Sequence, residues 1–343
     1  MLIKKNKIPV AEMVLIGFLP SFLKVLIYKF KGYKIGKNVS IGLGSVIIGE
    51  NVGIGDNTKI GFISVIRART IHIARYVTIG SLTMIDTGDL SIDEDARINE
   101  NVIVGGTKTP QSMLKIGKRV IIMEYAFINT TMPIHIGDDS GIGGHCLLFT
   151  HGSWLNQLDG FPVTFAPITI GKKVWLPWRV FIMPGVTIGD EVVIGANSLI
   201  SSNLPSNVMA AGTPAKILKE NYPAKITSDK RNDILVSIIN EFAEYLNYNN
   251  IVNSLTIIDG VYTLEVIKNK KQMYLIYIHD LKNEYAPPAH IDTLVVDYPS
   301  KSADIKARMI LNLHDKTRKG STDLGEEFSK YLSRHGIRFD RLD

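Results

Sequence analysis

The sequence predicts a mainly β protein whose short strands wind into a parallel β-helix. Between residues 33 and 220 an isoleucine, valine or leucine returns about every six residues, usually with a glycine behind it. The clearest run contains Ile170-Gly171, Ile188-Gly189 and Ile194-Gly195. One buried aliphatic side chain per six residues fits three short strands per coil, stacked along a central axis. An ordinary antiparallel β-sandwich predicts less regular spacing and is the weaker interpretation.

The residues expected at the corners between strands support the same fold. Asn38, Asn51, Asn57 and Asn197 lie with the glycines close behind repeat aliphatics. Glycine adopts positive φ freely, and asparagine tolerates it better than most residues. We therefore expect these asparagines at corners that require positive φ.

Composition limits the remaining possibilities. The chain has 343 residues, 45% hydrophobic and 21% charged, which is typical of a soluble globular protein large enough for two domains. Its single cysteine, Cys146, excludes an internal disulfide, fits a reducing compartment and is expected to be a small buried residue. The formal charge of +6 favours anionic partners, but no basic helix with interleaved aromatics predicts nucleic-acid binding.

Residues 1–32 form an apolar and basic N-terminal segment. Lys4, Lys5 and Lys7 precede an apolar run over 10–19, and a second apolar stretch with lysines covers 22–31. The runs are too short and interrupted to span a bilayer, and the small-residue cleavage site of a signal peptide is missing. We expect two short helices with two compatible roles: lying on a membrane surface, or capping the open end of the coil stack.

Two interruptions of the repeat, over 105–115 and 152–167, predict where the chemistry lies. Insertions in a solenoid emerge as loops from its corners, and loops on a rigid scaffold carry binding groups. The second interruption begins directly after His151. We therefore expect a functional loop next to this histidine.

The segment from His145 to Lys219 resembles the hexapeptide-repeat acyltransferases, especially the galactoside and maltose O-acetyltransferases and the polysaccharide O-acetyltransferases. The matching stretches are Thr150-His151, 167–171, Val174-Trp175, 184–190, 193–196 and 211–217. The resemblance implies a left-handed parallel β-helix over 33–220, a homotrimer, and acetyl-CoA bound between neighbouring subunits. The left hand comes only from the resemblance, because ordinary parallel crossovers are right-handed.

The family uses a histidine at the position of His151 as general base. An imidazole that exchanges its proton near neutral pH can accept the hydroxyl proton of a sugar as its oxygen attacks the thioester, and then return it to the leaving thiolate. No acyl-enzyme is needed, although Cys146 and Ser153 lie near in sequence as alternative nucleophiles. His145, one repeat earlier, is expected on another side of the coil and not as the partner of His151.

The resemblance also implies cofactor-binding residues. Ala196 and Ser201 match positions that line the acetyl-CoA groove, and Lys216 and Lys219 fall where basic residues meet the nucleotide phosphates. Trp178 departs from the family, which usually has a small residue there along the pantetheine channel. Its ring is expected to narrow the channel, stack on a ligand or face the trimer interface.

The expected acceptor-binding residues are Glu124, Asn129, Trp154 and Asp159, because carboxylates, amides and aromatic faces suit sugar rings and hydroxyls. No metal is expected. His135, His145 and His151 lie ten and six residues apart. Ligands that share one groove should instead recur near the coil period of about eighteen residues.

Residues 221–343 depart from the repeat and predict an α+β accessory domain. Apolar spacing predicts a helix over 229–246, and further segments predict strands and a last helix. The strands cover 256–259, 262–267, 273–279 and 293–296, with a turn at 269–271, and the last helix covers 324–333. The basic cluster over 316–319 is interpreted as an anion contact or a solvated loop.

Together these observations predict an O-acetyltransferase that moves acetyl from acetyl-CoA to a sugar hydroxyl, with His151 as base. The N-terminal segment and the accessory domain favour a bacterial surface polysaccharide or its lipid-linked precursor as carbohydrate acceptor. The expected location is the cytoplasm, at the inner face of the membrane. An N-acetyltransferase for an amino sugar, and a non-catalytic β-helix binding or assembly protein whose groove Trp178 closes, are the alternatives.

Overall fold

The computed structural model of the chain describes residues 10–258, 260–268, 271–278, 291–297 and 307–342. The chain divides into two compact units, Met1–Ala224 and Lys225–Asp343. The sequence placed this boundary at residues 220 and 221, a few residues earlier.

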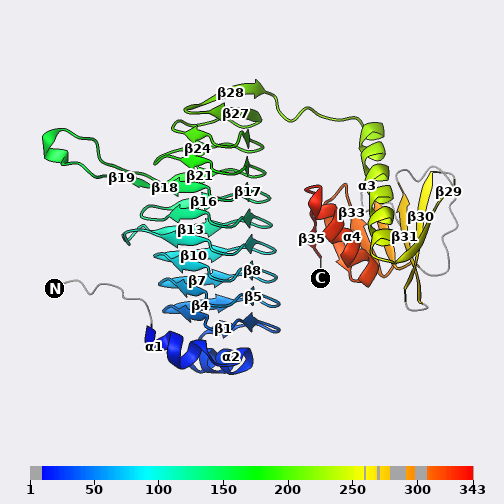
Figure 1. Cartoon of the computed structure of the whole chain (residues 1–343), viewed down its shortest axis with the longest axis horizontal. Coiled ribbons are helices and arrows are strands. Elements are labelled where there is room, and N and C mark those ends of the chain that lie inside the picture. Colours follow the sequence, from blue (N-terminus) through cyan, green and yellow to red (C-terminus); the bar gives the residue numbers. More distant parts are fainter. Residues whose placement is uncertain (1–9, 259, 269–270, 279–290, 298–306, 343) are drawn as a thin grey trace. The chain divides into compact units, whose positions relative to one another are not determined.

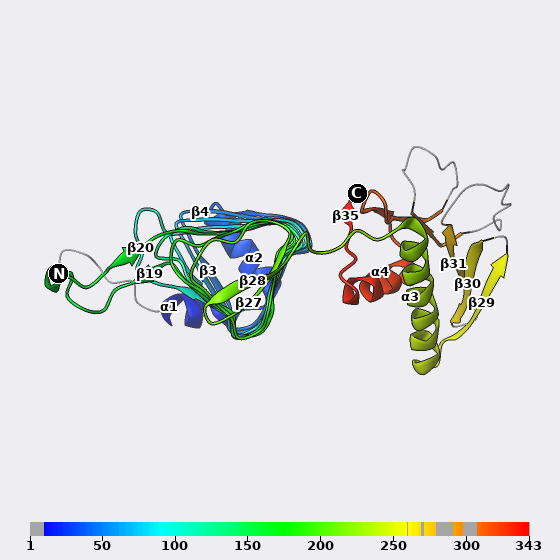
Figure 2. The ribbon, with the colours of Figure 1, turned by 90° about the horizontal axis from the view of Figure 1, so that it is seen from above.

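The first unit is a stack of coils whose strands form three sheets, one on each side of the stack, parallel except for the last strand pair, β27 and β28 (Figures 1 and 2). The first sheet contains β1 (Lys34–Ile35), β4 (Asn51–Ile54), β7 (Thr70–Ile73), β10 (Asp89–Ile92), β13 (Met113–Ile116), β16 (Ile134–Ile136), β21 (Ile168–Ile170) and β24 (Thr187–Ile188). The second contains β2 (Ser40–Ile41), β5 (Lys59–Ile60), β8 (Thr78–Ile79), β11 (Arg97–Ile98), β14 (Ile121–Ile122), β17 (Gly141–Ile142), β22 (Trp175–Leu176), β25 (Val193–Ile194), β27 (Val208–Gly212) and β28 (Ala215–Glu220). The third contains β3 (Val46–Ile48), β6 (Val65–Arg67), β9 (Met84–Asp86), β12 (Ile103–Gly105), β15 (Phe127–Asn129), β18 (Leu147–Phe149), β23 (Phe181–Ile182) and β26 (Leu199–Ile200).

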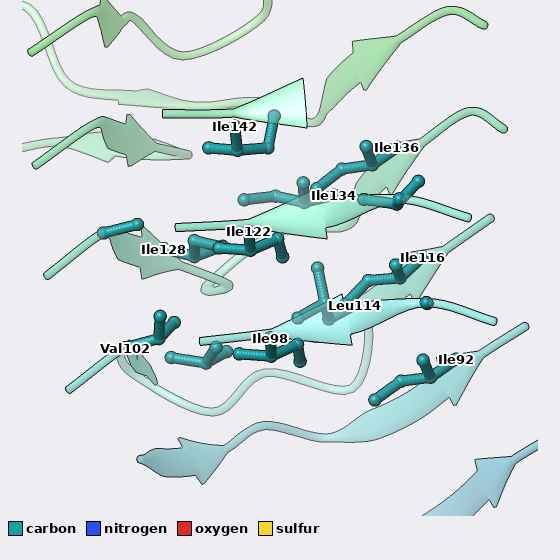
Figure 3. Close-up of a cluster of buried hydrophobic side chains, with 14 of the residues drawn as sticks. Ile92, Ile98, Val102, Leu114, Ile116, Ile122, Ile128, Ile134, Ile136 and Ile142 are labelled. Atoms are coloured by element: carbon teal, nitrogen blue, oxygen red, sulfur yellow. The ribbon is translucent and has the colours of Figure 1, made fainter. Parts of the chain in front are cut away.

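The repeat aliphatics form columns inside the stack. In the first sheet the register places Ile92 beside Ile116, Ile116 beside Ile136, and Ile136 beside Ile170. Figure 3 shows Ile92, Ile116 and Ile136 of this column beside side chains of the other sheets, and all members of the column are almost fully buried. Each coil therefore covers the aliphatic side chains of the next, which confirms the predicted parallel β-helix.

Most corners have one residue with positive φ. Asn38, Asn57 and Asn197 occupy such positions with φ of 54°, 59° and 58°, as predicted. Asn51 does not: it begins β4, so its prediction as a corner residue was wrong. The spacing alone could not separate a corner from the first residue of the next strand, because single-residue slips move the corner along the repeat.

Both interruptions of the repeat leave the stack at the same corner, between the third and first sheets. The first follows β12 and covers residues 106–112, before β13. The second follows β18 and forms an antiparallel ribbon of β19 (His151–Gly152) and β20 (Thr164–Phe165), with the 3-10 helix η2 (Gln157–Asp159) near its tip (Figure 1).

The N-terminal segment lies at the first coils of the stack (Figure 1). It contains α1 (Val10–Glu12), the π-helical turn η1 (Met13–Gly17) and α2 (Ser21–Phe30). Among the described residues no single helix is long and apolar enough to cross a membrane. The pair 10–17 and 21–30 reaches that length and composition only together, and it bends by 119° at the break.

The described residues of the second unit form a seven-stranded mixed sheet and two helices. The sheet order is β29-β30-β31-β32-β33-β34-β35, with bounds Val252–Ile258, Val261–Lys268, Lys271–Ile278, Thr293–Val296, Met309–Asn312, Thr317–Gly320 and Asp340–Arg341. The helices are α3 (Ser228–Tyr248) and α4 (Asp323–Arg334). Their apolar faces share one core, in which the rings of Phe242 and Phe328 lie 4.9 Å apart between centroids. The predicted α+β class is confirmed.

Two expectations for this unit need correction or lie outside the described residues. In the basic cluster over 316–319, Lys316 lies in an exposed turn, but the rest belongs to β34, and Arg318 is neither solvated nor open to an external anion, because its side chain is only 6% exposed and is paired with Glu326 at 3.0 Å. The strands β33 and β34 were not predicted. Residues 269–270 of the turn expected at 269–271 fall outside the described residues, as do the strand ends expected at 259 and 279.

Candidate active site

His151 follows the last strand of its coil, where the chain departs from the repeat. Thr150, fully buried, fixes this departure: its hydroxyl donates to the Asn129 carbonyl at 2.8 Å and accepts from the Met132 backbone N–H at 3.0 Å. Where the ribbon returns to the stack, the Ala166 N–H donates a third hydrogen bond, to the Thr150 carbonyl at 3.0 Å. We call residues 129–132 and 150–152 the loop corner.

Asn129 orients the imidazole of His151. It ends β15, directly beneath Phe149 of β18, and is 4% exposed. Its side-chain Oδ1 accepts from the Thr131 backbone N–H at 3.2 Å and lies 3.1 Å from His151 Nδ1. Because the backbone donor identifies this atom as the amide oxygen, His151 Nδ1 must carry the proton that it shares with Asn129. Nε2 is then the nitrogen with a free lone pair.

The first interruption supports this arrangement from below. The Thr107 N–H donates to Thr131 Oγ1 at 3.2 Å, and the Thr109 hydroxyl donates to the Thr131 carbonyl at 2.8 Å. Thr131 Oγ1 in turn lies 3.4 Å from His151 Nδ1. Gly106, at φ 133°, leaves room for these groups, since a Cβ there would lie 2.8 Å from Thr131 Oγ1. The two interruptions of the repeat thus form one site.

Aromatic rings flank the imidazole. Phe165 on β20 stacks on His151 with 5.7 Å between centroids and 13° between planes, and Phe149 lies 6.5 Å away on another side. The tip of the ribbon is open to solvent. Trp154 is 95% exposed, and Asp159 on η2 is also exposed. Both expected acceptor residues therefore lie in the exposed part of the ribbon.

A second group of expected site residues lies at the other end of the same strands. Glu124 precedes β15 and accepts from Asn99 Nδ2 at 2.8 Å. At the same corner Tyr125 stacks on His145 with 5.0 Å between centroids, and His145 meets Trp178 at 5.7 Å. The Trp178 ring covers Gly144, where a Cβ would lie 2.5 Å from it. We call Glu124, Tyr125, Gly144, His145 and Trp178 the stacking corner.

Within one chain the structure therefore brings together Asn129 and His151 but not Glu124. Strand β15 separates the loop corner from the stacking corner. Ala196 lies one coil above Trp178 on the stacking side, where the Asn197 N–H donates to the Trp178 carbonyl at 3.1 Å. Ser201 follows β26 on the loop side, and Lys216 and Lys219 are exposed on β28.

The alternative nucleophile Cys146 is sealed inside the stack. It is fully buried, its thiol donates to the Pro177 carbonyl at 3.0 Å, and burial raises its pKa to about 11. A thiol in this state is a poor nucleophile near neutral pH. Ser153 is exposed on the ribbon. Across the described ranges, no group of three or more His, Cys, Asp or Glu side chains is arranged to hold a metal ion.

Solved structures with a similar chain path include two acetyltransferases. One is the polySia-specific acetyltransferase NeuO, 24% identical, with a TM-score of 0.34 over 57% of this chain and 90% of that chain. The other is a hexapeptide-repeat-containing acetyltransferase from Vibrio cholerae O1 biovar eltor, complexed with acetyl-CoA. It is 20% identical, with a TM-score of 0.27 over 62% of this chain and 84% of that chain.

Sequence relatives show the family. The "Putative colanic acid biosynthesis acetyltransferase WcaF" of Escherichia coli is 32% identical over 130 residues, 36% of this chain and 69% of that protein. The galactoside O-acetyltransferase of Escherichia coli is 54% identical over 103 residues, 28% of this chain and 50% of that protein. No protein-family model matches the chain. The chain belongs to the hexapeptide-repeat acetyltransferases, the family with the left-handed parallel β-helix, and is an acetyltransferase.

Proposed function

We propose that this protein transfers acetyl from acetyl-CoA to a sugar hydroxyl, in a surface polysaccharide or its lipid-linked precursor, with His151 as general base. The observation that carries the proposal is the 3.1 Å contact between Asn129 Oδ1 and His151 Nδ1. It commits Nδ1 as a donor and leaves Nε2 as the acceptor that a general base requires. The similarity to the colanic acid acetyltransferase supports the choice of acceptor.

The reaction is a single displacement at the thioester carbonyl. His151 Nε2 accepts the hydroxyl proton as the sugar oxygen forms its bond to the acetyl carbon. The carbon–sulfur bond then breaks, and the imidazolium returns the proton to the departing CoA thiolate. Asn129 holds the imidazolium in place throughout, as the orienting member of a triad does. Phe149 and Phe165 limit water at the base.

A homotrimer would complete the site. Each strand of the third sheet begins with an apolar residue, and these residues include Met84, Ile103 and Leu147 at 41%, 46% and 37% exposed. Leu82 at 52% and Phe62 at 63% extend this surface around the neighbouring corner. A stripe of this kind along one side of the stack is suited to a second copy of the chain. Assembly along it would place the stacking corner of one subunit opposite the loop corner of its neighbour.

This assembly assigns the remaining expected residues. Glu124 would then meet the acceptor beside a neighbour's His151, with Trp154 and Asp159 approaching from the ribbon. Acetyl-CoA would lie between subunits along Trp178, Ala196 and Ser201, with its phosphates near Lys216 and Lys219. The exposure of both lysines fits contact with a phosphate at the groove's open end. The expected location remains the cytoplasm, where acetyl-CoA is available.

The test is an acceptor screen with purified full-length protein, acetyl-CoA and panels of sugars, polysaccharides and lipid-linked glycans. Mass spectrometry is expected to find an acetylated product that mild alkali cleaves, formed by wild type and not by His151→Ala. An alkali-stable product on an amino sugar would instead establish the N-acetyltransferase. If wild type binds no acetyl-CoA by calorimetry and Trp178→Gly does, the groove is closed and the non-catalytic alternative holds.

A further inference from the structure

In α2 two polar side chains lie inside and both phenylalanines lie outside. On α2, Lys24 and Tyr28 are 0% and 1% exposed. On the same helix Phe22 and Phe30 are 71% and 83% exposed, although phenylalanine is ordinarily buried. This is the reverse of the usual amphipathic helix packed on a soluble domain.

The buried polar groups account for the capping of the coil stack. Lys24 Nζ donates to the Gly42 carbonyl at 2.6 Å and to the Ser45 carbonyl at 3.1 Å. The Tyr28 hydroxyl accepts from the Ile47 N–H at 2.9 Å. These bonds occupy backbone groups of the first coil that have no coil beneath them, which is what a terminal cap must provide. Capping therefore uses the inner face of α2 and leaves the outer phenylalanines without a role in it.

The apolar outer face continues onto the preceding turn. Val14, Leu15 and Phe18 are 61%, 72% and 64% exposed, while Ile16 between them is buried against the stack at 9%. The Gly17 carbonyl accepts from the Gly44 N–H, so this turn is also fixed to the first coils by its inner side. Both helical segments thus present apolar side chains away from the coils. We call Val14, Leu15, Phe18, Phe22, Leu26 and Phe30 the apolar face.

Basic residues border this face. From residue 10 to residue 41 the chain has five lysines and one acidic residue, Glu12. Of the lysines only Lys24 is buried, and Lys29, Lys31 and Lys34 are exposed. A helix with aromatic and aliphatic side chains on one side and lysines at its border binds at the interface of a membrane with anionic lipids. A second copy is a poorer occupant, since a two-fold contact would bring the like-charged borders together.

We propose that the apolar face is a docking surface for an anionic lipid bilayer, which holds the first coil of the stack against the membrane. Phe18, Phe22 and Phe30 enter the boundary between headgroups and acyl chains, and Lys29 and Lys31 meet the anionic headgroups. The surface lies on the N-terminal cap and includes none of the residues assigned to acetyl transfer. It therefore stands whether or not the proposed acceptor is correct.

The test is flotation of the full-length protein with vesicles of phosphatidylcholine, alone or mixed with phosphatidylglycerol. Wild type is expected to float with the mixed vesicles and to be released by high salt. The triple variant Phe18→Ser, Phe22→Ser, Phe30→Ser is expected to lose at least about tenfold in partitioning. The matched control Tyr248→Ser, Ile257→Ser, Ile258→Ser changes side chains that are 84%, 58% and 65% exposed on the second unit, and is expected to float like wild type.

Wild type that stays at the bottom with both vesicles would overturn the proposal, as would a triple variant that floats like wild type. Equal flotation with pure phosphatidylcholine would overturn the assignment of an anionic surface. A triple variant with a changed oligomeric state, together with a wild type that does not float, would assign the apolar face to contact between copies. Acetyl transfer to a soluble acceptor should be the same in all three proteins, which separates this test from that of the enzymatic activity.

Discussion

The two corners that border the third sheet differ in structure, although both belong to the same coils. At the loop corner the chain leaves the repeat, and the polar side chains of Asn129, Thr131 and Thr150 are buried with their hydrogen bonds satisfied. At the stacking corner the repeat continues, and Tyr125 and Trp178 are 54% and 47% exposed. Directed hydrogen bonds need a dry, fixed setting, whereas a surface for a ligand or a subunit needs exposed area. The comparison separates the proposed base, at the loop corner, from the residues at the stacking corner that are expected to contact a ligand or a neighbouring subunit.

The largest effect is expected at the loop corner itself. His151→Ala removes the proton acceptor and should lower kcat by about 10²- to 10⁴-fold, the usual contribution of a general base. The KM for acetyl-CoA should change little, because His151 acts on the acceptor hydroxyl. Steady-state release of the CoA thiol measures both constants. If His151→Ala retained most of the wild-type kcat, another residue would have to be the base.

Asn129→Leu is expected to have the next largest effect. It keeps the volume of the side chain and removes the oxygen that accepts from His151 Nδ1, so the imidazole can adopt the wrong tautomer. We expect kcat to fall about 10- to 100-fold, less than a full loss of orientation costs in a serine protease triad. Asn129→Asp, which keeps an acceptor at that position, is the matched control and should retain more activity. If both variants match wild type, Asn129 does not position the base.

At the stacking corner the effect should be smaller. Trp178→Gly removes one aromatic contact, and acetyl-CoA binding should weaken about two- to tenfold, in line with the energy of an aromatic pair. Calorimetry on both proteins gives the dissociation constants. Much tighter binding by the variant would mean that the ring obstructs the groove. The stacking corner would then not be a surface that binds acetyl-CoA through Trp178.

The last expected effect is on stability and not on activity, and it lies one coil beneath the first interruption. Asp86 ends β9 and binds Arg67 and, from the first loop, Lys108. Burial alone would raise the pKa of Asp86, but the hydrogen bonds from Arg67 and Lys108 together hold this pKa below its usual range. The stabilisation is therefore complete above the ordinary aspartate pKa of about 4 and is lost as the pH falls through the lower folded value.

Urea unfolding of wild type and Asp86→Asn measures this contribution. At neutral pH the variant should be about 1–3 kcal/mol less stable, since it loses hydrogen bonds to charged groups. The difference should shrink toward the acid end, below about pH 4. If the difference in unfolding free energy between the two proteins did not change with pH, the carboxylate charge of Asp86 would not be what anchors the first loop.

The repeat made most of the first unit predictable, and the reason is physical. One aliphatic side chain per strand must face the axis, so Ile170 and Ile188, one coil period apart, could be placed in one column from spacing alone. The candidate for the proposed base was also recognisable, because His151 stands where the spacing breaks. What spacing could not show is the contact between the two loops, since the lengths of insertions do not specify how they pack. Gly106 and Phe165 were missed for this reason.

Asn129 was selected for a different role from the one that its contacts indicate. An amide near the base suits a sugar hydroxyl as well as an imidazole, and only the register of β15 on β18 places it beneath the histidine. Glu124 and Asn129 lie at different corners because strand β15 separates them. The repeat spacing already implied a strand at this position, so this separation could have been predicted. In the second unit, Arg318 looked solvated because its neighbours are basic, yet its side chain is buried and paired with the half-buried Glu326.

The tautomer of His151 tests the central claim most directly. Nitrogen-15 NMR of protein labelled only at its histidine side chains, with His151→Ala to identify the signal, distinguishes a protonated ring nitrogen from a bare one. The account predicts that neutral His151 carries its proton on Nδ1, with Nε2 bare, and that Asn129→Leu loses this preference. A proton on Nε2 in the wild-type protein would contradict the account, because that nitrogen would then have no lone pair for the acceptor hydroxyl.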